Sequence, residues 1–164
     1  MIQRIQTLYL LVAGIFPAIS LFVPLVVFSE GARWASMSAF GCESALVQEL
    51  AGFHPYGLLV FTLLASLSAL YAIFGYKNRK SQIKKVYLTI VFNVIWYVAL
   101  GAYTYSVSER IGLGYTFTIS ALLPIIALIA LFLALKGIRK DEALVRAADR
   151  SEERRVGKEC RSRW

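Results

Sequence analysis

Four long apolar runs, separated by polar connections, constrain the fold of this chain more than any other feature. They occupy residues 7–28, 56–74, 86–105 and 115–135, and each holds about 19 to 22 residues. An α-helix of that length rises about 30 Å, which matches the hydrocarbon core of a bilayer. Only helices and closed barrels satisfy all their backbone hydrogen bonds in lipid. We therefore expect an all-α fold: a polytopic membrane protein built as an antiparallel four-helix transmembrane bundle.

The composition supports a membrane protein and limits the kinds of function. Hydrophobic residues make up 58% of the 164 residues and charged residues 17%, whereas soluble domains have roughly 45–50% and about 25%. A chain of this length that forms four spans has no room for a separate soluble catalytic domain. Any function must therefore come from the bundle and its connections.

Basic residues flank the apolar runs on one side only. They are Arg4 before the first run, Lys77, Arg79, Lys80, Lys84 and Lys85 between the second and third, and Lys136, Arg139 and Lys140 after the fourth. The connections on the other side, 29–55 and 106–114, are weakly acidic and neutral. Loops rich in Lys and Arg stay on the cytoplasmic side of a membrane. The pattern predicts a multi-pass protein of the bacterial inner membrane with both termini in the cytoplasm.

The formal net charge of +8 is compatible with nucleic acid or with a membrane surface as the partner, and the placement of the basic residues predicts the membrane surface and no nucleic acid. The Lys and Arg residues flank apolar runs and do not form a stripe along a soluble helix. We expect them to anchor the protein to anionic headgroups at the cytoplasmic face of the bilayer.

Asn93 is the one strongly polar side chain inside the third run. A buried amide in lipid usually bonds to a neighbouring helix, and contact with a substrate is the rarer alternative. Pro17 and Pro24 fall in the first run and Pro124 near the middle of the fourth, so we expect both spans to be kinked or broken. None of the runs contains Asp, Glu, Lys, Arg or His, which are the side chains that usually mark ion paths.

The connection 29–55 is the longest, and residues 45–51 within it have the pattern of a short helix lying against the bundle. An enzyme would need Glu43, Glu49 and His54 of this connection to act together. His54 is the only histidine, and Cys42 has no base near it in the sequence. We therefore expect no catalytic, cofactor-binding or metal site.

Beyond the fourth run the chain becomes charged, and we expect residues 136–150 to continue as a solvated cytoplasmic helix. Glu142 precedes Arg146 by four residues, the favourable order for a helical ion pair. Residues 151–164 have no apolar period, and SEERRVGKECRSRW resembles the translation of a widely used sequencing adapter. We expect this last segment to be non-native and disordered.

Three segments carry a family resemblance: the start MIQRIQTLYLL, the bend YKNRKSQI at residues 76–83 and the exit IRKDEALVRAADR at residues 138–150. With them, residues 1–150 resemble a family of small four-span bacterial integral membrane proteins catalogued as a domain of unknown function. The resemblance implies no activity, substrate or cofactor. It does imply recurrent polar positions, which are candidate partner contacts: Arg79, Gln82, Arg139, Asp141, Glu142 and Arg146.

Two kinds of function agree with these patterns. The first is a non-enzymatic structural, partner-binding or regulatory membrane protein, whose partner is another membrane protein or a second copy of the chain. The alternative is a small oligomeric transporter or ligand-binding bundle that uses Asn93 and the two spans broken by proline. The first requires no chemistry that the sequence lacks, and we prefer it.

Overall fold

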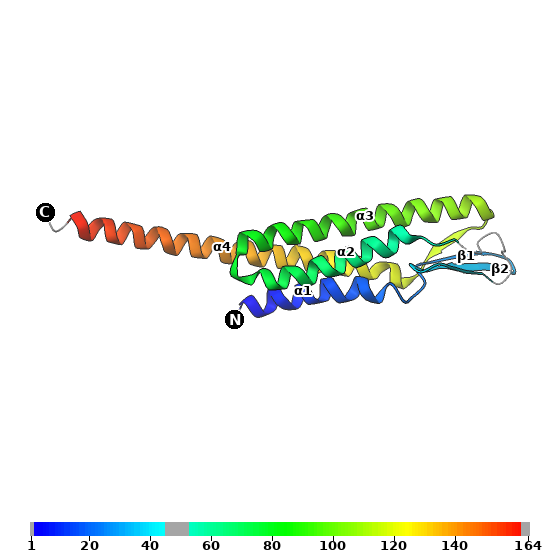
Figure 1. Ribbon diagram of the computed structural model, residues 1–164, viewed down its shortest axis with the longest axis horizontal. Coiled ribbons are helices and arrows are strands. Elements are labelled where there is room, and N and C mark those ends of the chain that lie inside the picture. The colour runs from blue at the N-terminus through cyan, green and yellow to red at the C-terminus, as the bar shows by residue number, and fades with distance from the viewer. Residues whose placement is uncertain (1, 45–52, 162–164) are drawn as a thin grey trace.

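A computed structural model describes residues 2–44 and 53–161 of the chain, and it is an elongated helical bundle with a small sheet at one end (Figure 1). The α-helices of the described residues are α1 (Ile2–Ile19), α2 (Tyr56–Ile73), α3 (Arg79–Ile111) and α4 (Leu123–Arg161). Successive helices run in opposite directions (Figure 1). Helix α1 packs against α2 and α4, and α3 packs against the same two helices. The fold is therefore an antiparallel helical bundle.

Within the described residues, three helical stretches are long and apolar enough to cross a membrane. They are Tyr56–Ile73, Arg79–Ile111 and Ile119–Ala148. The apolar part of α1, Ile5–Ile19, is shorter. These lengths agree with a helical membrane protein.

The first expected span is wrong in its second half. Helix α1 ends at Ile19, and strand β1 (Val26–Glu30) occupies the end of the apolar run. Pro17 is tolerated two residues before the helix ends, and the Ser20 hydroxyl donates a hydrogen bond of 2.6 Å to its carbonyl oxygen. Pro24 then lies between helix and strand, where its missing N–H costs no helical hydrogen bond.

The fourth expected span also begins differently. Residues Tyr115–Phe117 form strand β4, and a 3₁₀ turn, η3 (Ile119–Leu122), precedes α4. Pro124 is the second residue of α4, not a residue near its middle. The first N–H groups of a helix have no intrahelical partner, so proline fits there without breaking the helix.

Four antiparallel strands, which an all-α fold did not predict, cap one end of the bundle. The strands β2 (Arg33–Met37) and β3 (Cys42–Ser44) complete a sheet whose order is β3-β2-β1-β4 among the described residues. Glu30 pairs with Arg33 around a two-residue turn. Gly31 has a φ of 61° there, in the left-handed region that favours glycine. The helix expected over residues 45–51 lies outside the described residues.

One face of this sheet packs on the helices. Val26, Phe28, Ala35 and Met37 are fully buried, in a cluster that also contains Trp96 and Leu100 of α3. Because side chains alternate across a strand, these residues share one face of the sheet. The sheet is thus part of the core at this end of the bundle, which also contains Leu58 of α2 and Val107 of α3.

Small residues dominate the core at the other end. Ala69 and Ala72 of α2 and Ala127, Ala130 and Ala134 of α4 all belong to a second buried cluster. Alanine allows helix backbones to approach closely, which is how helices associate when lipid removes most of the hydrophobic driving force. These small residues therefore serve helix packing.

The connection 76–85 is mostly helical. After α2 a single 3₁₀ turn, η2 (Phe74–Lys77), leads to Asn78, whose side chain accepts a hydrogen bond from the backbone N–H of Ser81 at the start of α3. Helix α3 is consequently 33 residues long, and it extends the expected span 86–105 at both ends. Its C-terminus is Gly112, with a φ of 64°, again in the left-handed region that glycine favours.

The charged segment after the fourth run continues α4 without a break, as expected for residues 136–150. The structure differs from the expected disorder over residues 151–161, because α4 runs to Arg161. This segment has no proline and is rich in Glu, Arg and Lys, which favour helix when they extend an existing one. Residues 162–164 lie outside the described part of the chain.

Candidate functional site at the basic end of the bundle

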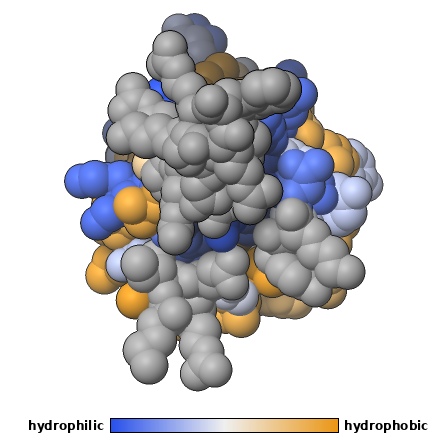
Figure 2. Space-filling view, turned by 90° about the vertical axis from the view of Figure 1, so that its left-hand side faces the viewer, coloured by the Kyte–Doolittle hydropathy of each residue, from blue (hydrophilic) through white to orange (hydrophobic). Residues whose placement is uncertain are grey.

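The segments with the basic residues meet at one end of the bundle. The start of α1, the connection between α2 and α3, and the point where α4 leaves the bundle lie together, opposite the sheet (Figure 1). Viewed from this side, hydrophilic surface lies between hydrophobic patches at the periphery (Figure 2). We call this region the basic end.

A buried hydrogen bond joins α1 to α4 at the basic end. The side-chain amide of Gln6 donates to Asp141 Oδ2 over 2.7 Å, and the two residues are 7% and 9% exposed. Gly137 lies one helical turn before Asp141, on the same face of α4. A Cβ at Gly137 would come within 3.1 Å of Gln6 Cγ and 3.2 Å of Gln6 Nε2. The missing side chain of Gly137 therefore makes room for Gln6 to reach Asp141.

Arg79 joins α3 to the same point. Its guanidinium Nη1 donates to the backbone carbonyl of Asp141 over 2.8 Å. An intrahelical partner would normally take that carbonyl oxygen, so Arg79 bonds to α4 through the second acceptor position of the oxygen. Asp141 is thus the residue at which α1, α3 and α4 are joined.

The three segments of the family resemblance supply this arrangement. Gln6 belongs to the starting segment, Arg79 to the bend and Asp141 to the exit, and Gly137 directly precedes the exit segment. Residues 2–150 match the family described as Domain of unknown function (DUF4293). The chain belongs to this family. No curated protein matches the DUF4293 chain.

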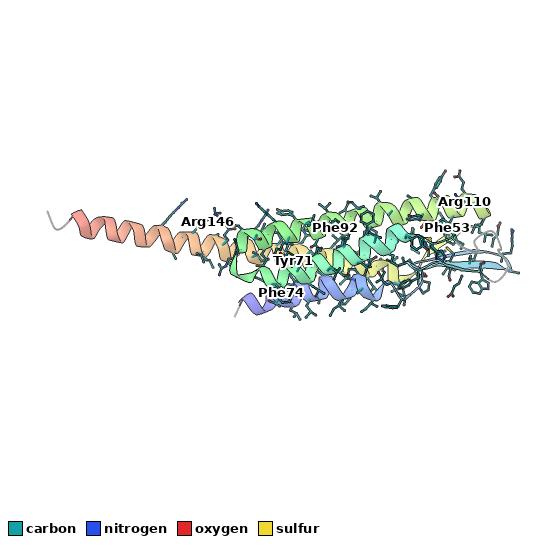
Figure 3. All side chains as sticks on the ribbon, in the orientation of Figure 1. Phe53, Tyr71, Phe74, Phe92, Arg110 and Arg146 are labelled. Carbon is teal, nitrogen blue, oxygen red and sulfur yellow. The ribbon has the colours of Figure 1, made fainter. Side chains whose placement is uncertain are left out.

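The candidate partner contacts of the DUF4293 chain divide into buried and exposed residues. Gln82 is 7% exposed and Asp141 9%, and Arg79 is half-buried. These three have little surface left for a partner. Arg139 and Arg146 are exposed, and Arg146 donates to Glu142 Oε1 over 2.6 Å in the expected ion pair. Figure 3 places Arg146 on the part of α4 that projects beyond the bundle.

Two of the basic residues contact tyrosines at the surface of the DUF4293 bundle. The Lys85 ammonium lies 3.6 Å from the centre of the Tyr71 ring. Arg139 donates a hydrogen bond to the Tyr87 hydroxyl, and its guanidinium carbon lies 5.4 Å from the Tyr87 ring centre. The side chains that are simply exposed are Lys80, Lys84, Lys136 and Lys140. The side chains of Arg4 and Lys77 lie outside the described residues.

Sequence reasoning missed the roles of Gln6 and Gly137. Gln6 directly precedes an apolar run and was part of the starting segment, but its partner is 135 residues away. Gly137 and Asp141 have the four-residue spacing of one helix face, and that spacing was a usable signal. Neither residue reveals the other, because only the tertiary packing of α1 on α4 brings them together.

Asn93 takes the place expected of it in the core but not the expected partner. It is 1% exposed, and its amide donates over 3.0 Å to the carbonyl of Thr89 in its own helix. The bond between neighbouring helices is made one turn away, where the hydroxyls of Ser68 in α2 and Thr89 in α3 lie 2.9 Å apart. Asn93 therefore points into packed core and does not face a solvent-filled space.

Of the outer-connection side chains that an enzyme would need, the structure describes His54 and Glu43. His54 Nδ1 lies 2.8 Å from the carbonyl oxygen of Phe40, and Glu43 is exposed. Glu49 lies outside the described residues. Burial raises the pKa of the Cys42 thiol to about 11, so it is protonated at neutral pH and a poor nucleophile.

Proposed function

We propose that the chain is a four-span protein of the bacterial inner membrane, with both termini in the cytoplasm, that binds and regulates a membrane-protein partner without catalysing a reaction. The observation that carries this proposal is the joining of α1, α3 and α4 at Asp141. It fixes the direction in which α4 leaves the bundle. A charged helix held at a fixed angle to the membrane is suited to recognition, because little entropy is lost when a partner binds it.

The short first helix still allows four spans. Its apolar part, Ile5–Ile19, rises about 22 Å, and the following residues continue in the same direction toward the sheet (Figure 1). Ser20, Leu21 and Leu25 are 1%, 7% and 0% exposed, whereas the apolar Phe22 is 79% exposed. Irregular backbone is tolerated at membrane depth when protein surrounds it. This burial supports a crossing completed by residues 20–25.

The projecting part of α4 offers the partner contacts. Leu144 and Val145 are 57% and 46% exposed and lie between the charged residues Glu142 and Arg146. Exposed aliphatic side chains beside charges are typical of surfaces that another protein covers. A membrane-protein partner or a second copy of the chain would meet Arg139, Glu142 and Arg146 here.

The transporter alternative has weaker support. It relied on Asn93 lining a polar crevice and on proline breaks in the first and fourth spans, and of these two the first span is interrupted, because α1 ends at Ile19. Asn93 bonds to its own helix in the core, and Pro124 lies in the first turn of α4. Neither residue opens a path through the bundle.

Affinity purification from native membranes tests the partner proposal. The bait is the full chain, and the variant carries Leu144→Asp with Val145→Asp. The matched control is Trp34→Asp with Phe40→Asp, which changes two exposed apolar residues at the sheet end of the molecule. We expect a reproducible partner with the unaltered chain and the control, and its loss with the α4 variant. Recovery of no reproducible partner would overturn the proposal.

Cysteine labelling from outside intact cells tests the topology. Cysteines at position 78, in the basic end, and at position 112, beside the sheet, replace Asn78 and Gly112 in a chain without Cys42 and Cys160. We expect an impermeant maleimide to label position 112 and to leave position 78 unmodified until the membrane is opened. The reverse pattern would invert the proposed orientation.

A further inference from the structure

The surface of α3 at the basic end combines positive charge, a tyrosine hydroxyl and adjoining apolar residues. Lys80, Lys84 and Tyr87 are spaced by four and three residues, so they share one face of α3. All three are exposed. The same face continues with Val91 and Val94, each 50% exposed. The surface therefore changes from basic to apolar at Tyr87.

Helix α4 shows the same change beside it. Arg139 is exposed and bonds to the Tyr87 hydroxyl across the boundary between the helices. One to two turns nearer the sheet, Phe132 and Leu133 are 57% and 45% exposed. On both helices, exposed apolar residues give way to basic residues at the height of the Tyr87 and Arg139 pair. In the bilayer placement of the proposed function, phospholipid headgroups would meet acyl chains at that height.

The basic residues on this surface lack acidic partners. In the described part of the chain, the ion pairs are Glu30 with Arg33 and Glu142 with Arg146. Asp141 Oδ2 accepts from Gln6 instead. Lys80, Lys84 and Arg139 therefore have no carboxylate within ion-pair distance among these residues. Their charge is left available for an anion from outside the chain.

We propose that Tyr87 and Arg139, with Lys80 and Lys84, bind the phosphate of an anionic phospholipid whose acyl chains lie along the apolar surface of α3 and α4. The guanidinium donates to phosphate oxygens with the two-pronged geometry that arginine prefers. The tyrosine hydroxyl donates a further hydrogen bond, and the lysines add charge attraction. The basic end as a whole attracts anionic lipid, and these four residues would form a defined binding site within it. It rests on the bilayer placement in the proposed function.

The test measures lipid retention by the full chain in detergent. Native mass spectrometry follows the binding of phosphatidylglycerol and of phosphatidylcholine with the same acyl chains. The variants are Arg139→Gln, Lys84→Gln and Tyr87→Phe. The matched control is Arg110→Gln, which removes one positive charge at the opposite end of α3 (Figure 3). Thermal unfolding of each protein identifies a variant that fails to fold. If Arg139→Gln fails to fold, Lys84→Gln tests the site instead, because Lys84 is exposed.

We expect the unaltered chain and Arg110→Gln to retain phosphatidylglycerol in preference to phosphatidylcholine. Each loss of a site charge should weaken phosphatidylglycerol binding about fivefold, the value of roughly 1 kcal/mol per basic residue near a lipid surface. Tyr87→Phe should weaken it too while keeping the charge. Equal weakening by Arg110→Gln and Arg139→Gln, or no preference between the two lipids, would overturn the site. Displacement of the lipid by millimolar inorganic phosphate would overturn its assignment to a phospholipid.

These outcomes are independent of the proposed topology and partner. Lipid in detergent reaches either end of the bundle, so an inverted orientation in cells would leave the lipid result unchanged. If the unaltered chain shows no preference for phosphatidylglycerol, and a cysteine at position 78 is still protected from labelling, the lipid site is overturned and the topology stands.

Discussion

Gln6 and Asp141, 135 residues apart in the sequence, form a buried hydrogen bond of 2.7 Å that joins the first and last helices. Both side chains are buried, so neither is available on the surface to bind a partner. A carboxylate shielded from water needs a donor, and the Gln6 amide supplies one without adding charge. The bond also sets where α4 stops packing on α1 and starts to project from the bundle (Figure 1).

Replacing Gln6 by alanine should therefore destabilise the bundle measurably. The change leaves the Asp141 carboxylate buried without its donor, at a cost of about 1–3 kcal/mol. The measurement is thermal or denaturant unfolding in a fixed detergent. Arg146→Gln is the control, because it removes the exposed member of the ion pair with Glu142, and a helical pair of this kind is worth about 0.5 kcal/mol. Equal losses for the two variants would mean that the Gln6 bond carries no special weight.

Gly137→Ala should be destabilising only while Gln6 is present. The added Cβ would lie 3.1 Å from Gln6 Cγ, so the Gln6 side chain must shift by a few tenths of an ångström, and we expect this shift to weaken its bond to Asp141. We expect a loss of about 1–3 kcal/mol in the unaltered chain. In the Gln6→Ala background the same change should be neutral or slightly stabilising, because alanine favours helix over glycine. A cost that is the same in both backgrounds would contradict this coupling.

The outer sheet shows why part of the fold could not be predicted from the apolar pattern. Val26, Val27 and Phe28 continue the first apolar run, and a short apolar segment does not by itself distinguish helix from strand. Their partner strands lie at residues 33–37 and 115–117. The turn at Gly31 was the local signal of a hairpin, since glycine at the first position of a two-residue turn is typical of one.

The basic end shows the converse. Charge alone predicted that Arg79, Lys85 and Arg139 would gather in one region, and the segments of α3 and α4 that carry them lie at one end of the bundle (Figure 1). Charge could not predict that Asp141 would be buried, because its burial depends on Gln6 of α1, which is 135 residues away in the sequence. Local patterns fix which residues share an end, and side-chain packing decides which of them remain exposed.

The place of Pro124 leads to a third prediction. In the first turn of α4 the missing N–H of Pro124 costs no intrahelical hydrogen bond. Pro124→Ala should therefore change the free energy of unfolding by less than about 1 kcal/mol. Ile129, in the interior of the helix and 55% exposed, provides the comparison. Ile129→Pro should cost about 3 kcal/mol or more relative to Ile129→Ala. A large loss for Pro124→Ala in the same unfolding assay would show that the proline has another structural role.

Cys42 provides a test of the sheet through its ionisation. Partial burial in β3 raises the pKa of its thiol to about 11. Only the thiolate reacts with iodoacetamide, so at pH 8 the folded protein should react on the order of a hundredfold more slowly than an ordinary thiol of pKa about 8.5. The rate should rise about tenfold per pH unit and level off only near the raised pKa.

The same shift affects stability in a definite direction. The neutral thiol is favoured in the fold, so its contribution is complete below pH about 8.5 and is lost as the pH rises through the raised pKa of the folded state. The reaction rate with iodoacetamide is measured on a Cys160→Ser chain, in which Cys42 is the one remaining thiol. The same chain unfolded in urea is the control. A folded-state rate that levels off near pH 9 would contradict the burial of Cys42 against the sheet.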